Sequence, residues 1–134
     1  MLLLLFLTAY FTRDIWLHML GLDTNNGLLD VTVNQRNIEL DLRDNGLEID
    51  GDRIQLLLNG AIVLEDHTLT ETGTIVNLDL KKGTNQVVIQ ALNEGYSSPN
   101  TVYVAISHVV EGPSEQVSDG LLTGEKAEFT IRAP

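Results

Sequence analysis

Cysteine is absent from this chain of 134 residues, and aromatic residues are scarce. Without cysteine the fold has neither a disulfide nor a thiolate for metal binding or nucleophilic attack. Three phenylalanines, three tyrosines and one tryptophan leave little aromatic surface on which nucleic-acid bases stack. The core and the contacts with partners must therefore supply all of the stability.

Positive charge is also scarce, and this limits the range of partners. Eight Lys and Arg residues stand against 19 Asp and Glu residues, which gives a formal net charge of −11. A chain with this charge repels phosphate backbones and anionic membrane surfaces. We therefore expect no nucleic-acid partner.

The length suits one folded domain preceded by an apolar segment. We assign the segment to residues 1–27 and a β-sandwich domain to residues 28–134. The beginning of the chain, MLLLLFLTAYFTRDIWLHML, lacks the basic start and the small-residue cleavage site of a signal peptide. Arg13 and Asp14 interrupt it before it reaches the roughly 20 apolar residues of a membrane span.

Two alternatives for this segment stay open. One is anchoring in a membrane through residues 1–20, and the other is a helix or arm whose apolar surface is covered by protein. We expect the second, because an uncovered surface of this size is unusual on a soluble monomer. The residues expected to make assembly contacts are Leu2, Leu3, Leu4, Leu5, Phe6 and Leu7.

After residue 27 the chain consists of short aliphatic and β-branched runs separated by Gly, Asn and Asp, at a spacing typical of sandwiches. The expected strands are Leu29–Val33, Asn37–Leu42, Arg53–Leu58, Ala61–Glu65, Thr74–Leu80, Gln86–Leu92, Thr101–Val109 and Lys126–Arg132. No helical pattern lies between them, which favours antiparallel pairing. The sequence therefore predicts an all-β protein, an antiparallel β-sandwich of seven to nine strands with an apolar N-terminal helix or arm. Asn59-Gly60 predicts a tight hairpin turn, because both residues accept positive φ.

An acidic loop precedes one of the expected strands in the sequence DNGLEIDGDRI, which starts at residue 44. An EF-hand is excluded, because aligning Gly51 with the central glycine places Gly46 and Leu57 where carboxylates are required. A different calcium site would take its oxygen ligands from Asp44, Glu48, Asp50 and Asp52. The competing interpretation, which we favour, is that these side chains cap backbone N–H groups in Asx turns.

Catalytic patterns are not recognisable in the sequence. Ser97 and Ser98 lack the G-x-S-x-G elbow of serine hydrolases, and no helix is expected after them. His18, His67 and His108 lack the spacing of zinc ligands. We expect that the protein is not an enzyme.

Two motifs together resemble a known domain. The pattern DNG, IDGDRI and LNG within residues 44–60, followed by A-x-N-x-G-x-x-x-P-N-T at residues 91–101, resembles a small β-sandwich domain of secreted and surface proteins from Bacteroidetes and other bacteria. The resemblance covers about residues 38–132. It implies a sandwich outside the cytoplasm with a structural or interaction role, and it implies no catalytic residue. In physical terms, Asn93 and Asn100 are expected to bond backbone groups and tie two loops together.

Two functions remain in competition. The first is a non-catalytic subunit of an extracellular assembly, such as a filament, a surface layer or a virion, in which the apolar N-terminus packs on a neighbour. The alternative is a calcium-assisted module that binds carbohydrate or another surface ligand. No cofactor is expected other than calcium.

Overall fold

The computed structural model describes residues 29–44, 51–95 and 100–134, and these residues form ten strands. The strands are β1 (Leu29–Val33), β2 (Asn37–Asp44), β3 (Arg53–Leu58), β4 (Ala61–Thr68), β5 (Thr74–Asp79), β6 (Gly83–Ala91), β7 (Asn100–Ile106), β8 (Val109–Glu111), β9 (Glu115–Leu121) and β10 (Lys126–Ala133). The all-β prediction is confirmed. The apolar segment before residue 28 and its expected helix or arm lie outside the described residues.

The number of strands exceeds the seven to nine that the sequence predicts. A turn at Ser107 and His108 divides the expected strand Thr101–Val109 into β7 and β8. His108 has a φ of 61°, a left-handed conformation that a straight strand does not contain. The further strand β9 has the polar sequence EQVSDGL, which lacks the β-branched alternation of the other strands.

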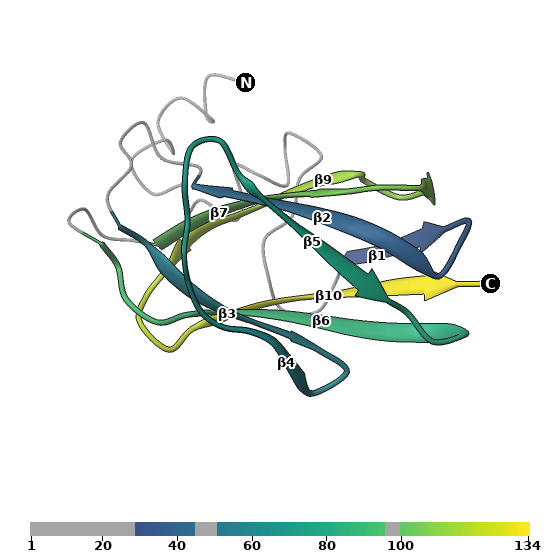
Figure 1. The fold of residues 1–134 in the computed structure, drawn as a ribbon, viewed down its shortest axis with the longest axis horizontal. Coiled ribbons are helices and arrows are strands. Elements are labelled where there is room, and N and C mark those ends of the chain that lie inside the picture. Colours follow the sequence, from purple (N-terminus) through teal and green to yellow (C-terminus); the bar gives the residue numbers. More distant parts are fainter. Residues whose placement is uncertain (1–28, 45–50, 96–99) are drawn as a thin grey trace, which may run out of the picture.

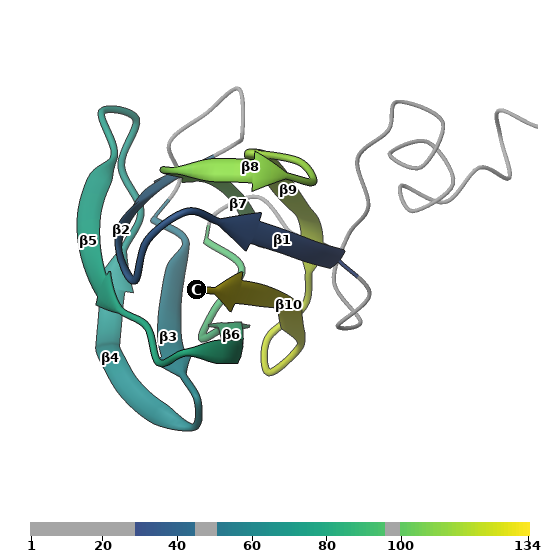
Figure 2. The ribbon, with the colours of Figure 1, turned by 90° about the vertical axis from the view of Figure 1, so that its right-hand side faces the viewer.

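The strands form two sheets that face each other, as in a β-sandwich. One sheet has six strands in the order β4-β3-β6-β10-β1-β8, and the other has four in the order β5-β2-β7-β9. Figure 1 shows the two layers from the side, and Figure 2 shows them from one end, where the strands surround a common interior. Only β3 and β4 are consecutive strands of one sheet, and elsewhere the chain alternates between the sheets.

Pairing between neighbouring strands is antiparallel with one exception. Strand β1 runs parallel to β10, with Leu29 opposite Phe129 and Thr32 opposite Arg132. The prediction of a purely antiparallel sandwich is therefore wrong at this one pair. The two strands are neighbours although almost the whole described chain separates them in sequence.

Alternating side chains from both sheets fill one core. On β2, Ile38, Leu40 and Leu42 are buried while Glu39 between them is exposed, as the period of a half-buried strand requires. Strand β10 of the other sheet contributes its buried Phe129 to the same core. The members of the core cluster include Val31, Ile54, Leu56, Val87, Ile89, Val102, Val104 and Ile131.

The predicted hairpin turn is confirmed between β3 and β4. Asn59 has a φ of 51° and Gly60 a φ of 83°, so both residues adopt the left-handed conformation that a tight hairpin requires. Within residues 29–44, 51–95 and 100–134, no helix is long and apolar enough to cross a membrane.

Candidate functional site

The sandwich has two different ends, and each gathers polar residues. Strand β2 runs from one to the other, beginning at Asn37 and ending at Asp44. We call the end that contains Asp44, Asp52, Asn93 and Asn100 the closed end. The opposite end, which contains Asn37 and His108, is called the open end.

Two asparagines join separate segments at the closed end. The Asn93 side chain accepts a hydrogen bond from the Arg53 backbone N–H at 2.7 Å and donates one to the Gly51 carbonyl at 3.0 Å. The Asn100 side chain is fully buried and donates to the Arg53 carbonyl at 2.9 Å and to the Asn93 carbonyl at 3.0 Å. The start of β3, the end of β6 and the start of β7 are thereby held together by side-chain amides.

Two buried carboxylates meet at Thr101 beside these asparagines. Asp52 is 1% exposed and accepts a hydrogen bond from the Thr101 backbone N–H at 2.9 Å. Asp44 is 8% exposed and accepts one from the Thr101 hydroxyl at 3.3 Å. Asp52 belongs to the loop before β3 and Thr101 to β7, so the first of these contacts joins one sheet to the other.

The calcium hypothesis is not tested by this geometry. Asp44 and Asp52 both reach Thr101, and their oxygens are of the kind that calcium prefers. Glu48 and Asp50, the other two predicted ligands, lie outside the described residues. In the part of the chain that the structure describes, no three His, Asp or Glu side chains gather as a metal site would require. Calcium binding therefore stays a prediction.

The predicted serine and histidine candidates are distributed differently. Ser97, Ser98 and His18 lie outside the described residues. The His67 ring shares a hydrogen bond of 2.8 Å with the Thr74 hydroxyl, which joins β4 to β5. His108 lies at the open end, where the sequence predicts no site.

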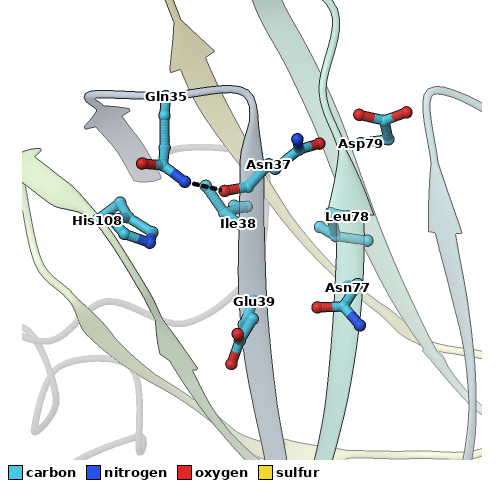
Figure 3. A pocket seen from close by; sticks show the side chains of 8 residues that line it. All are labelled: Gln35, Asn37, Ile38, Glu39, Asn77, Leu78, Asp79 and His108. Atoms are coloured by element: carbon cyan, nitrogen blue, oxygen red, sulfur yellow. Dashed lines mark hydrogen bonds between the residues drawn. The ribbon is translucent and has the colours of Figure 1, made fainter.

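A polar hollow of about 430 Å³ occupies the open end, on the outer side of β2 and β5. Its lining residues are Gln35, Asn37, Ile38, Glu39, Asn77, Leu78, Asp79 and His108 (Figure 3). The register between β2 and β5 explains how four of them meet, because Asn37 pairs with Asp79 and Glu39 with Asn77. These four polar side chains share one face of the sheet.

Backbone contacts fix the other two polar members of the hollow. The Gln35 amide donates to the Asn37 carbonyl at 2.6 Å, which holds it over the start of β2 (Figure 3). The His108 carbonyl, in the turn between β7 and β8, accepts a hydrogen bond from the Asn34 N–H at 3.0 Å. The hollow thus presents amides, carboxylates and an imidazole, groups that form hydrogen bonds with hydroxyl-rich ligands.

A charged cluster lies on the outer face of the four-stranded sheet, nearer the closed end. Arg43 pairs with Asp41 at 2.7 Å, and this hydrogen bond raises the pKa of the Arg43 guanidinium. Burial raises the pKa of the neighbouring Tyr103 hydroxyl, and a hydrogen bond to Glu115 raises it further. Gly73 lies directly against the Asp41 and Arg43 side chains.

Comparison with known proteins gives no relative for this chain. No family model matches it, and neither a curated protein nor a solved structure shows significant similarity. The resemblance to the bacterial surface domain therefore stays a prediction from the two motifs.

Proposed function

We propose that this chain is a non-catalytic structural or interaction subunit of an extracellular assembly. The observation that carries the proposal is the position of the exposed apolar side chains. Ile62 of β4 and Ile75 of β5 are each 56% exposed, and Val110 of β8 is 61% exposed. All three strands are sheet edges, where unpaired backbone groups are available for pairing with another chain.

The use of polar groups at the closed end supports the same proposal. Asn93 and Asn100 bond backbone groups, and Asp52 receives the Thr101 N–H. Groups engaged in this way stabilise loops and are poorly placed to activate a substrate. The buried polar chemistry at this end thus supports a framework role.

The apolar N-terminus supplies a source of association energy. Burial of several hundred Å² from Leu2 to Leu7, at about 25 cal/mol per Å², would exceed several kcal/mol before the entropic costs of association. The partner is a second copy or another subunit, and the assembly lies at a cell surface, in the extracellular space or in a virion.

Light scattering after size-exclusion chromatography tests this function. The full chain is compared with a variant that lacks residues 1–20, a deletion that leaves all ten described strands intact because β1 starts at Leu29. We expect oligomers for the full chain and a folded monomer for the truncation, with circular dichroism as the check on folding.

Two results would contradict the proposal. A full chain that stays monomeric across a wide concentration range would contradict assembly. A monomeric full chain that unfolds after truncation would place the segment in the core of its own domain. Flotation of the full chain with lipid vesicles would instead indicate a membrane anchor.

The alternative function is a calcium-assisted module for a carbohydrate or another surface ligand. The polar hollow supports its ligand-binding part, whereas the candidate calcium ligands Asp44 and Asp52 lie at the closed end. The volume of the hollow and its amide and carboxylate lining suit a small hydroxyl-rich ligand. If the acidic loop binds calcium, each tenfold rise in free calcium above saturation adds about 1.4 kcal/mol of stability. Thermal melting with calcium and with a chelator tests the acidic loop. A calcium site predicts a higher melting temperature with calcium that is lost in Asp52→Asn, whereas turn chemistry predicts no effect of calcium.

A further inference from the structure

The four sheet edges differ in how well they are protected against another strand. Strand β8 has three residues, too few for extended pairing. Strand β9 contains Gly120 at a φ of 84° and has a register shift against β7. Strand β5 alternates its buried residues with exposed Ile75, Asn77 and Asp79, and Ile75 pairs with the charged Asp41 of β2. Charge, irregular backbone or short length thus protects three of the edges.

Strand β4 also has register shifts against β3, but its exposed Ile62 adjoins apolar neighbours, whereas the equally exposed Ile75 of β5 pairs with Asp41. Its first four residues, Ala61–Leu64, carry no charge, and the acidic pair Glu65 and Asp66 begins only after them. Ile62 pairs with Leu57 on β3, which in turn pairs with Val88 on β6. An apolar row therefore extends inward from this edge across the outer face of the six-stranded sheet.

We propose that the Ala61–Leu64 edge of β4 accepts the Leu2–Leu7 segment of a second copy as an added strand. This proposal rests on the assembly function proposed above and names its acceptor surface. The donor is apolar at six consecutive positions, enough to cover the four uncharged positions of the edge. Main-chain hydrogen bonds would join the strands, and the leucines would cover the exposed Ile62.

The distribution of charge favours this pair of surfaces. Each copy has a formal net charge of −11, so two copies repel each other over most of their surfaces. Leu2–Leu7 and Ala61–Leu64 contain no ionisable side chain. Contact between these two stretches therefore brings together the parts of the chains that oppose association least.

The positions of donor and acceptor determine the kind of assembly. Strand β1, which follows the donor segment, is the fifth strand of the six-stranded sheet, and β4 is the first. At about 4.8 Å per strand, they lie roughly 19 Å apart. Donor and acceptor are different segments of the chain, so the contact is heterologous and generates an open chain or a ring of copies, which includes a ring of two.

The chain's own β4 edge is a poorer acceptor for the segment. The direct line from β1 to β4 crosses the six-stranded sheet over β10, β6 and β3. The outward side chains of β6 and β10 on that route are mostly polar, among them Gln86, Gln90 and Glu128, with Val88 as an apolar exception. A second copy avoids this crossing.

Disulfide trapping tests the contact directly, because the natural chain contains no cysteine. A full chain with Leu4→Cys is mixed with a full chain with Ile62→Cys under mild oxidation. We expect a cross-linked heterodimer at about tenfold the yield of the matched mixture with Ile75→Cys, since docking raises the effective thiol concentration. Ile75 is the matched control because it is as exposed as Ile62 and lies on the edge of the other sheet.

Charge substitution gives a second readout that needs no cross-link. Both Ile62→Lys and Ile75→Lys place a lysine on an exposed position, so both variants should fold. We expect Ile62→Lys to be monomeric in light scattering and Ile75→Lys to assemble like the unaltered chain.

The outcomes separate this proposal from the function on which it rests. If both lysine variants assemble while deletion of residues 1–20 abolishes assembly, the assembly function stands and the β4 acceptor is wrong. If the unaltered chain is monomeric, the assembly function itself is wrong. A disulfide that forms within single chains of the Leu4→Cys/Ile62→Cys double variant would overturn the second-copy acceptor.

Discussion

The two ends of the sandwich use similar polar residues in opposite ways. At the closed end, the side chains of Asn93, Asn100 and Asp52 bond backbone groups and connect the two sheets. At the open end, Asn37 and Asp79 are exposed and line a hollow. The difference teaches that a conspicuous motif need not mark a binding site, because here the motif residues are those occupied in holding the fold.

The open end also contains a buried side chain that bonds backbone groups. Asn85 is fully buried there, and its side-chain amide accepts from the Lys81 N–H and donates to the Lys81 and Gly83 carbonyls. These contacts fix the turn that enters β6 within the six-stranded sheet. The hollow, by contrast, lies over the four-stranded sheet, where the polar side chains remain available to a ligand.

The largest expected effect is that of Asn100→Ala at the closed end. The change removes the donor to the Asn93 carbonyl and leaves a cavity at a fully buried position, so we expect a loss of about 2 to 3 kcal/mol. Asn37→Ala at the exposed open end should change stability by less than about 0.5 kcal/mol. Urea unfolding measures both, and equal losses would abolish the distinction between the ends.

A pair of glycines provides a matched comparison of crowding. Gly73 near the closed end and Gly83 at the open end have φ of 89° and 92°, so alanine suffers the same backbone strain of about 1 kcal/mol at either. At Gly73 the new Cβ also meets Asp41 and Arg43, whereas nothing lies within 4 Å at Gly83. We expect Gly73→Ala to cost about 1 kcal/mol more, since it also displaces the ion pair. Thermal melts of both variants are then repeated in an Asp41→Asn background. If the Asp41–Arg43 ion pair accounts for the extra loss in Gly73→Ala, that extra loss should disappear there.

At the hairpin turn of the open end, the effect of backbone conformation on stability can be measured without a change in packing. Gly60 has a φ of 83° and open space around its Cβ position, so Gly60→Val should lose about 1 kcal/mol through backbone strain alone. Gly60→Asn should lose less, because asparagine tolerates this conformation. If both variants melt at the temperature of the unaltered protein, strain at this turn does not limit stability.

The smallest effect concerns the ionisation of Tyr103 on the outer face near the closed end. Its folded pKa lies above the ordinary value of 10.0, through burial and then through Glu115. The folded state therefore favours the neutral phenol, and this stabilisation is complete below pH 10 and is lost as the pH rises through the folded pKa. In a Tyr10→Phe/Tyr96→Phe background, ultraviolet titration should show a lower Tyr103 pKa in Glu115→Gln. An unchanged titration would assign the whole shift to burial.

Much of the fold follows from local sequence, but not all of it. Strands such as β1 and β3 have the predicted bounds, because apolar alternation and flanking turn residues specify them. Strand β9 was missed since its pairing with β7, rather than its own composition, makes it a strand. The parallel pairing of β1 with β10 joins the two ends of the domain, and no local pattern encodes such a pairing.

The same limit applies to the candidate sites. Asp52, Asn93 and Asn100 were recognised because turn-forming residues cluster in continuous stretches of sequence. The hollow was not recognised, because its polar residues come from two strands and two turns and look like ordinary solvent-facing positions. Only the register between β2 and β5 brings Asn37 beside Asp79.

The parallel pair β1 and β10 gives the molecule a particular response to mechanical load. These strands lie closest to the two chain termini and run in the same direction, with four residue pairs from Leu29 opposite Phe129 to Thr32 opposite Arg132. Tension applied through the N-terminal segment and the C-terminus pulls them past each other lengthwise. The evenly spaced hydrogen bonds between them then share the force, whereas a hairpin opened from its free ends would lose them one after another. If neighbouring subunits hold the chain at both termini, tension therefore shears β1 against β10, and this is the direction in which the parallel pair is strongest.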